Sequence, residues 1–308
     1  MHAAVVTSFE RPPRYTEWPE PAPAPDGHAV VEVVAAALHP RVRSQADGSH
    51  YTSSGELPLI PGIDAVVRDA EGGLHYALLD DTAAGTLAER TVTDVRRSIP
   101  LPAGTDAVAV AAAMNPVMSS WVALKRRVAF APGSRVLVLG ATGSAGGMAL
   151  HVAQQFGAAE VIAAARPGVR LDALLGHGAD RVLALDDLAL AADVDAVLDY
   201  VWGAPSERGI VDIVTARADR SRPLTWIEIG SVAGPDLRLP SAALRAARLD
   251  LVGSGVGSVS GAEFRAELPR IAAAVSAGEF EIDTQTVPLA DVEAAWASET
   301  RRRLVFTP

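Results

Sequence analysis

The chain has 308 residues, of which 49% are hydrophobic and 21% are charged, with a formal net charge of −10 at pH 7. The absence of cysteine excludes disulfides, cysteine-ligated zinc sites and cysteine nucleophiles. The length favours two domains, and the absence of a basic stripe argues against a nucleic-acid partner.

The first twenty residues do not read as a signal peptide. The apolar run Ala3–Val6 is too short for one, and Arg and Pro follow it. We also expect no charge-free window of membrane-spanning length, and hence no membrane partner. The sequence therefore predicts a cytoplasmic protein.

Residues 1–100 show the pattern of short strands. Proline, glycine and aspartate separate short apolar runs, as in strands joined by turns. The proline-rich stretch Arg11–Pro25 is interpreted as a surface connection, with a polyproline ligand as the alternative. The expected strands are Ala3–Val6, Val30–Leu38, Ile63–Val67 and Tyr76–Leu79.

Helical patterns begin after residue 100. Apolar strands separated by helices are typical of a parallel sheet covered on both faces. The last segment is expected to return to the first domain. Helices are predicted at 107–114, 118–130, 147–156, 170–176, 206–217, 264–277 and 290–297, and strands at 135–139, 160–164, 181–184, 195–200, 224–229, 249–254, 280–287 and 304–307.

A glycine-rich turn after strand 135–139 is the most informative segment. Its pattern is GxxGxxG, with Ala141 standing where GxGxxG would have its first glycine. Such a turn brings the backbone close to a pyrophosphate and aims the free N–H groups of a helix at it. A strand–turn–helix corner without a ligand is the less favoured alternative. The expected contact residues are Gly140, Ala141, Thr142, Gly143, Ser144, Ala145 and Gly146.

The next strand indicates which dinucleotide would bind. NAD-binding units place an acid about 20 residues past the glycines, on the ribose 2′-hydroxyl. Here Arg166 stands at that place and Arg170 follows. Guanidinium groups bind a 2′-phosphate that a carboxylate would repel, so we predict NADPH rather than NADH. The alternative is that both arginines are solvated surface groups.

Several short segments together resemble the medium-chain dehydrogenase/reductase superfamily, on its zinc-free quinone oxidoreductase-like branch. The resemblance covers nearly the whole chain and rests on the order and spacing of the segments. It implies an α/β fold in which a Rossmann doubly wound parallel sheet (117–257) is inserted in a GroES-like β-rich substrate domain (1–116 plus 258–308), and a homodimer. The segments are Val30–Pro40, Leu57–Asp64, Leu87–Glu89, Ala113–Leu124, the glycine motif, Gly178–Asp180, Asp195–Asp199, Glu228–Ser231 and Gly253–Ser258.

The resemblance also bears on metal binding. Zinc members place a cysteine, a histidine and a cysteine or aspartate around the metal, and the matching positions here hold His39, Ile63 and Asn115. Ile63 cannot ligate a metal, so no metal is expected. An improvised site of His39, His50 and Asp64 is the disfavoured alternative.

Further NADPH contacts are implied by the resemblance. Ser119 stands at the family's threonine, near the nicotinamide, and Tyr200 would lie beside the ribose. Small residues let the backbone approach the ligand closely. The other implied contact residues are Asn115, Gly230, Ser231, Gly253 and Ser254.

The expected chemistry is hydride transfer, in which charge develops on a substrate oxygen and needs a hydrogen-bond donor or a proton. The candidates are Tyr51, which matches a family tyrosine, and His39, which replaces the family's usual asparagine. Alternatively, His39 bonds a backbone carbonyl and Tyr51 is a rim aromatic.

The sequence thus predicts an NADPH-dependent oxidoreductase that transfers hydride to a quinone or an enone-type C=C bond without a metal. A carbonyl or imine reductase of the same fold is one alternative, and a catalytically silent NADPH-binding regulator is another. The partner is a small-molecule substrate whose identity the residues do not specify.

Overall fold

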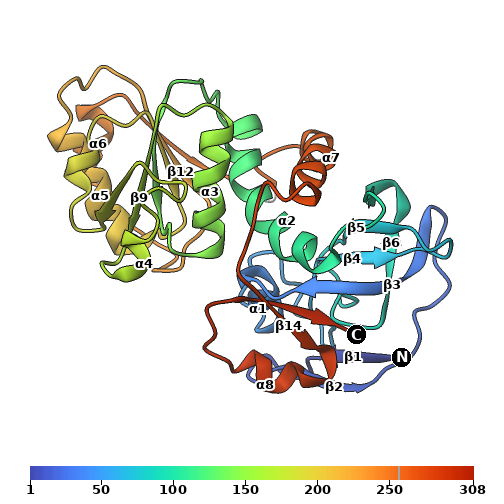
Figure 1. Ribbon diagram of the computed structural model, residues 1–308. Helices are drawn as coiled ribbons and strands as arrows, with labels where there is room; N and C mark the ends of the chain where they lie inside the picture. Colours follow the sequence, from blue (N-terminus) through green and yellow to red (C-terminus); the bar gives the residue numbers. More distant parts are fainter. Residues whose placement is uncertain (256) are drawn as a thin grey trace. The chain divides into compact units, whose positions relative to one another are not determined.

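The computed structural model describes residues 1–255 and 257–308 (Figure 1). They form two compact units: unit 1 comprises Met1–Asn115 and Leu268–Pro308, and unit 2 comprises Pro116–Glu267. Residues 258–267, assigned above to the first domain, therefore belong to unit 2. The roles expected for the two domains remain predictions.

Unit 2 is built on a six-stranded parallel sheet with the order β10-β9-β8-β11-β12-β13. The chain runs outward from β8 in one direction and then from β11 in the other. The carboxyl ends of these two strands therefore form the topological switch point where α/β sheets bind ligands. The strands are β8 Arg135–Leu139, β9 Glu160–Ala165, β10 Arg181–Ala184, β11 Ala196–Asp199, β12 Leu224–Glu228 and β13 Leu249–Gly253.

Helices α3 and α5 lie on opposite faces of this sheet (Figure 1). The central strand is apolar at successive positions, and Val136, Leu137, Val138 and Leu139 are all fully buried. Burial of alternate side chains against opposite layers explains why this strand lacks a polar face. The helices of unit 2 are α3 Ser144–Gln155, α4 Val169–Asp172, α5 Gly203–Ala216, α6 Ser241–Ala246 and the 3-10 turn η3 Leu188–Ala191.

The two helices expected at 107–114 and 118–130 are one helix. Helix α2 (Ala107–Val122) runs through Pro116 and continues as a π-helical turn, η2 (Ala123–Arg127). Proline removes one intrahelical hydrogen bond but does not end this largely buried helix. The border between the units falls inside α2, and again inside α7 (Gly261–Ser276).

Helix α2 also corrects an expectation about membranes. The stretch from Ala107 to Leu124 carries no charged residue, so a charge-free window of near-spanning length does exist. The helix Ala107–Arg127 is long and apolar enough to cross a membrane by length and composition, but 72% of its most apolar window is buried inside the protein. Such burial is the usual state of a core helix in a globular protein.

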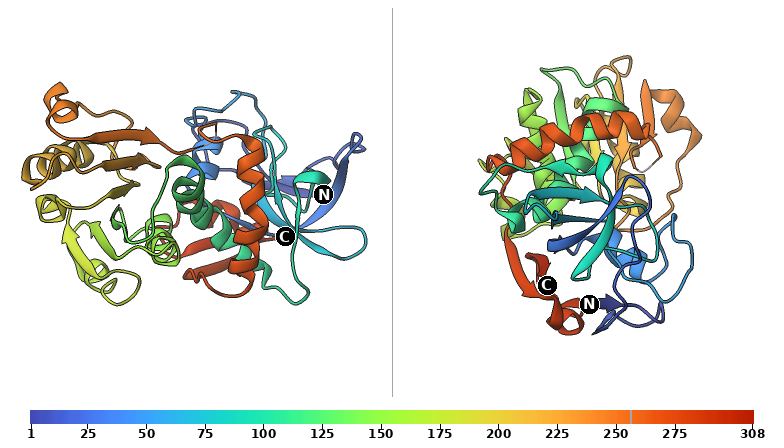
Figure 2. Two further views of the ribbon diagram at one scale, coloured as in Figure 1. Left: turned by 90° about the horizontal axis from the view of Figure 1, so that it is seen from above. Right: turned by 90° about the vertical axis from the view of Figure 1, so that its right-hand side faces the viewer.

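Unit 1 contains a seven-stranded mixed sheet, in which β14-β15-β3-β4-β5-β7 form the main order and β6 pairs with β3. Figure 2 shows the C-terminal strands, in red, beside the blue N-terminal strands, because β15 pairs with β3. The expected return of the chain end is thus confirmed. The strands are β3 His28–Ala37, β4 Asp64–Arg68, β5 Leu74–Leu78, β6 Arg90–Asp94, β7 Ile99–Pro100, β14 Thr284–Pro288 and β15 Arg303–Thr307.

The sequence did not indicate strands β2, β6 and β7 or helix α1 of unit 1. Strand β2 (Arg14–Glu17) lies within the proline-rich stretch and pairs with β1 (His2–Val5), so that stretch is only in part a surface connection. Helix α1 (Pro40–Ala46) starts directly after His39, with proline in its first turn. The remaining elements are the 3-10 turns η1 Val95–Arg97 and η4 Leu289–Asp291, and helix α8 Val292–Trp296.

A buried arginine holds the loops at the amino ends of β11 and β12. Arg217 follows α5 and donates to the carbonyls of Ala192 and Val194, at 2.5 and 2.8 Å. Its other terminal nitrogen donates to the carbonyls of Arg222 and Pro223, at 3.3 and 2.9 Å. Burial lowers the pKa of this guanidinium from its ordinary value.

We expect Arg217→Ala to lower the free energy of unfolding by about 2–3 kcal/mol, because it leaves several buried carbonyls without donors. Arg220→Ala is the matched control, since Arg220 is exposed and donates to one carbonyl; it should change stability by less than about 0.5 kcal/mol. Urea unfolding measures both. Equal midpoints for the two variants would contradict the assigned role.

Candidate dinucleotide and substrate site

The glycine-rich turn after β8 disfavours side chains at two positions. Gly140 has φ = 81°, a region that favours glycine, and a Cβ there would lie 3.2 Å from the Val201 side chain. Gly146, in the first turn of α3, faces the carbonyl of Gly140, and a Cβ would lie 2.3 Å from that oxygen. Helix α3 therefore packs directly on the turn.

The N-terminus of α3 lacks a side-chain cap. Gly143 is the N-cap residue, in an extended conformation, and has no side chain to accept a bond. The N–H groups of Gly140 and Ala141 donate to the Ala164 carbonyl at 2.8 and 3.2 Å, and that of Gly143 donates to the Gly140 carbonyl at 3.0 Å. The first helical turn, Ser144–Gly146, is thus the part of the motif suited to bind an anion.

The predicted contacts after β11 and on α2 come together. The Ser119 hydroxyl donates to the Pro116 carbonyl at 2.7 Å and lies 2.9 Å from the Tyr200 hydroxyl. Tyr200 therefore donates to Ser119. Burial raises the pKa of Tyr200 to about 12. Asn115 is half-buried, four residues before Ser119 on the same face of α2.

Small residues follow β12 and β13 at the same edge of the sheet. A Cβ on Gly230 would lie 3.5 Å from the Tyr200 carbonyl. Ser254 is buried and its N–H donates to the Glu228 carbonyl at 2.8 Å, whereas Ser231 and Gly253 are exposed. These residues share the edge with the glycine-rich turn because parallel strands end on one side. Val256, in the last of the quoted segments, lies outside the described residues.

A buried carboxylate shapes this edge. Asp199 ends β11, and its Oδ1 accepts the N–H groups of Val201 and Trp202 at 2.8 and 2.9 Å. Its Oδ2 accepts the indole N–H of Trp226 at 2.9 Å. The bonds hold Trp202 at φ = 53°, a left-handed value unusual for a bulky residue. The position of Asp199 at the end of a predicted strand was the only sequence signal for this role. Its partner Trp226, on β12, is identified only by the fold.

Asp199 also affects its neighbour on β12. Glu228 is half-buried, and burial raises the pKa of its carboxyl above the ordinary value, with the charge of Asp199 adding to the effect. The carboxyl groups of Asp199 and Glu228 therefore both lie at the edge of the sheet where the nicotinamide is predicted to bind.

Both predicted phosphate-binding arginines are exposed beside the glycine-rich turn. Arg166 directly follows β9, the neighbour of β8 in the sheet. Arg170 lies in α4, and its guanidinium donates to the carbonyl of Thr142. The structure thus brings Arg170 into contact with the motif, although the two are 28 residues apart.

In unit 1, Tyr51 is 72% exposed, and its ring lies 4.3 Å from the ring of His50. His50 belongs to a polar group with Arg41, Thr52 and Asp81. Burial, followed by the charge of Arg41, lowers the pKa of His50.

His39 is placed differently from both sequence-based alternatives. It is the N-cap residue of α1, its ring is 1% exposed, and its Nε2 lies 2.9 Å from Asp64 Oδ1. The Tyr76 hydroxyl donates to Asp64 Oδ2 at 2.7 Å. The side-chain partner of His39 is thus a carboxylate and not a backbone carbonyl. Burial raises the pKa of Tyr76 well above its ordinary value, and Asp64 adds to the shift.

Among residues 1–255 and 257–308, no group of three or more His, Asp or Glu side chains could hold a metal ion. The improvised set of His39, His50 and Asp64 is not assembled. His39 and Asp64 pair with each other, whereas His50 lies in the group around Arg41.

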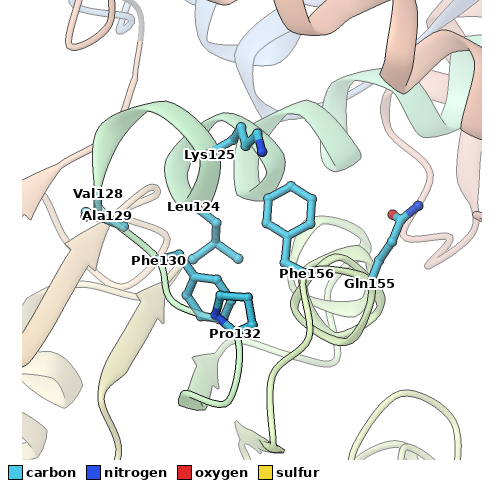
Figure 3. A pocket seen from close by; sticks show the side chains of 8 residues that line it. All are labelled: Leu124, Lys125, Val128, Ala129, Phe130, Pro132, Gln155 and Phe156. Carbon is cyan, nitrogen blue, oxygen red and sulfur yellow. The ribbon is translucent and has the colours of Figure 1, made fainter.

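A pocket of about 390 Å³ lies elsewhere in unit 2 (Figure 3). It is formed where the π-helical turn after α2 meets the C-terminal end of α3. Because the glycine-rich turn contacts the opposite end of α3, this pocket is not part of the candidate site. The residues labelled in Figure 3 are Leu124, Lys125, Val128, Ala129, Phe130, Pro132, Gln155 and Phe156.

Comparison with known proteins identifies the family, although no family model matches. Over an alignment of 362 residues covering all of both chains, the protein is 31% identical to a probable NADPH-dependent quinone reductase of Emericella nidulans. It belongs to the zinc-free quinone oxidoreductases of the medium-chain dehydrogenase/reductase superfamily.

Two other relatives agree with this family. The quinone oxidoreductase of Thermus thermophilus, solved alone and with NADPH, matches with a TM-score of 0.84 and 26% identity over all of both chains. A 2-methylene-furan-3-one reductase of Solanum lycopersicum is 28% identical over 178 residues, 52% of this chain and 45% of that protein. The α/β fold expected for a quinone oxidoreductase, with a Rossmann sheet and a separate β-rich sheet, is confirmed.

The residues of unit 2 fit a dinucleotide cofactor. The α3 N-terminus is uncapped, the turn before it is lined by glycines, and both lie at the switch point of the sheet. No other segment of the described unit combines these features.

We expect Gly146→Ala to weaken NADPH binding at least about tenfold, because its Cβ would push α3 away from the Gly140 carbonyl and misplace the anion-binding N–H groups. Gly147→Ala is the matched control. Its Cβ would lie 3.7 Å from the nearest atom, an ordinary contact. Calorimetric titration with NADPH tests both variants, and wild-type affinity in Gly146→Ala would refute the assignment.

Proposed function

We propose that this protein is an NADPH-dependent reductase that transfers hydride to a quinone or to an activated, enone-type C=C bond. The observation that carries the proposal is the full-length relationship to an NADPH-dependent quinone reductase, combined with the uncapped α3 N-terminus at the switch point. The related furanone reductase supports the second substrate class, an activated C=C bond.

We assign the cofactor contacts to the carboxyl edge of the unit 2 sheet. The first turn of α3 binds the pyrophosphate, and Arg166 and Arg170 bind the 2′-phosphate. Helix α2 and the ends of β11, β12 and β13 contact the nicotinamide and its ribose. The residues proposed there are Asn115, Ser119, Tyr200, Gly230, Ser231, Gly253 and Ser254.

When bound, NADPH supplies a hydride from C4 of its nicotinamide. The chain then has to stabilise the charge that develops on the substrate oxygen. We assign that work to Tyr51, whose hydroxyl donates a hydrogen bond, and to His39. No metal is required, because these groups provide the polar contacts that a zinc ion provides in other branches of the superfamily.

We further propose that unit 1 binds the substrate and that the protein is a cytoplasmic homodimer. Strand β13 supports the dimer, since it ends the sheet order and has one unpaired edge in the monomer.

NADPH consumption with a small substrate panel tests the activity. We expect turnover with 1,4-benzoquinone or simple enones, and less with aldehydes and cyclic imines, because hydride addition to a conjugated system leaves a delocalised anion. Preference for aldehydes or imines would instead favour a carbonyl or imine reductase. Tight NADPH binding without any turnover would refute the enzyme and favour a regulator.

The 2′-phosphate assignment is tested with Arg166→Ala and Arg170→Ala. Loss of one charge-assisted contact should weaken NADPH binding about tenfold or more while leaving NADH binding unchanged. Arg208→Ala is the control, because Arg208 is an exposed residue of α5 that pairs with Asp186. Equal losses for NADPH and NADH would contradict recognition of the phosphate.

A further inference from the structure

A buried chain of side chains in unit 1 joins two neighbouring strands to the start of α1. His39 Nε2 lies 2.9 Å from Asp64 Oδ1, and the Tyr76 hydroxyl lies 2.7 Å from Asp64 Oδ2. The side chains of His39 and Asp64 are each 1% exposed, and Tyr76 is fully buried. The polar atoms here are thus shielded from water.

We propose that Asp64 and Tyr76 are positioning residues for His39, and that they present its Nδ1 as the atom that protonates the reduced substrate. This inference rests on the proposed reductase function. It assigns to Asp64 and Tyr76 a part in the reaction that neither sequence pattern nor family membership indicated.

The hydrogen bonds fix the ring of His39. A carboxylate can only accept, so Tyr76 donates its O–H to Oδ2 and His39 donates its Nε2–H to Oδ1. A neutral ring is then held as the Nε2–H tautomer. Thr86 Oγ1 donates to the backbone carbonyl of Asp64 at 3.0 Å, which fixes the residue itself.

The other charged group near Asp64 is Arg303 of β15. Its Nη1 donates to the Leu38 carbonyl at 3.0 Å, and burial lowers its pKa to about 10 while the charge of Asp64 opposes that shift. The uncharged Gln45 of α1 faces the same region and binds the Gly62 N–H at 2.8 Å through its Oε1.

The remaining nitrogen of His39 has no partner. Nδ1 is buried and makes no hydrogen bond to any described residue. An unsatisfied buried polar atom is uncommon, and one at a candidate site requires an explanation. A substrate oxygen that occupies this place would satisfy it.

The proton transfer balances as follows for an enone. Hydride adds to the β-carbon, and the electrons of the C=C bond shift to give an enolate oxygen. The Nδ1–H bond of the His39 imidazolium breaks, its electrons stay on nitrogen, and an O–H bond forms on the substrate. The neutral ring keeps Nε2–H against Asp64 and takes its next proton from water that enters when the product leaves. A quinone accepts the proton on its reduced oxygen in the same way.

Unit 1 contains a second histidine–carboxylate pair, which is not buried and serves as a control for His39 and Asp64. His75 Nε2 lies 2.7 Å from Asp69 Oδ2, but the two side chains are 25% and 28% exposed. Asp69→Asn therefore removes a histidine–carboxylate pair of the same kind outside the candidate site.

The variants His39→Asn, Asp64→Asn, Tyr76→Phe and Asp69→Asn test the proposal. We expect His39→Asn to lower kcat about 100-fold, within the range of general acid catalysis, with little change in NADPH affinity. Asp64→Asn should lower kcat about tenfold or more, and Tyr76→Phe should lower it less. Asp69→Asn should match the wild type.

A measurement on the wild type does not depend on whether these variants fold. Nitrogen-15 NMR of histidine-labelled protein should show His39 with its proton on Nε2 at high pH. An Nδ1–H tautomer would overturn the proposal, as would wild-type kcat in both His39→Asn and Asp64→Asn. If the wild type reduces no quinone or enone, the proposed function fails. The NMR measurement of the His39 tautomer still tests whether Asp64 and Tyr76 position its ring.

Discussion

The close contact between α3 and the turn after β8 is the constraint on which the predicted cofactor site depends. Gly146 faces the Gly140 carbonyl with no space for a Cβ, so the helix begins directly at the carboxyl end of the central strand. Because Gly143 provides no side-chain cap, the N–H groups of the first turn stay available for an anion. A bulkier residue at position 146 would separate the helix from the sheet.

The second half of the sheet edge depends on a different interaction. Asp199 accepts three N–H groups, two from the turn that follows it and one from the Trp226 indole on the neighbouring strand. The bonds compensate the burial of a carboxylate and position Tyr200, whose hydroxyl reaches Ser119. The glycine-rich turn depends on the absence of side chains, whereas the turn after β11 depends on the fully buried side chain of Asp199.

Local patterns allowed much of unit 2 to be predicted. The strands around the motif lie within one or two residues of their expected positions, because continuous apolar runs bounded by glycine are unambiguous in a parallel sheet. Local rules failed where packing overrides them. Two helices were expected where α2 runs unbroken through Pro116, and helix α5 begins at Gly203 rather than at residue 206. Strand β2 contains no proline itself, but it was hidden by the prolines that flank it on both sides.

The sequence by itself determined the dinucleotide motif, the arginines near it and the family, because each depends on residues close together in the chain or on their order along it. Only the tertiary structure decided the partners of His39. Asp64 lies 25 residues away, and Tyr76 reaches the same carboxylate from the next strand. The pairing of β4 with β5 and the turn of the chain into α1 bring these groups together, and no spacing rule connects them.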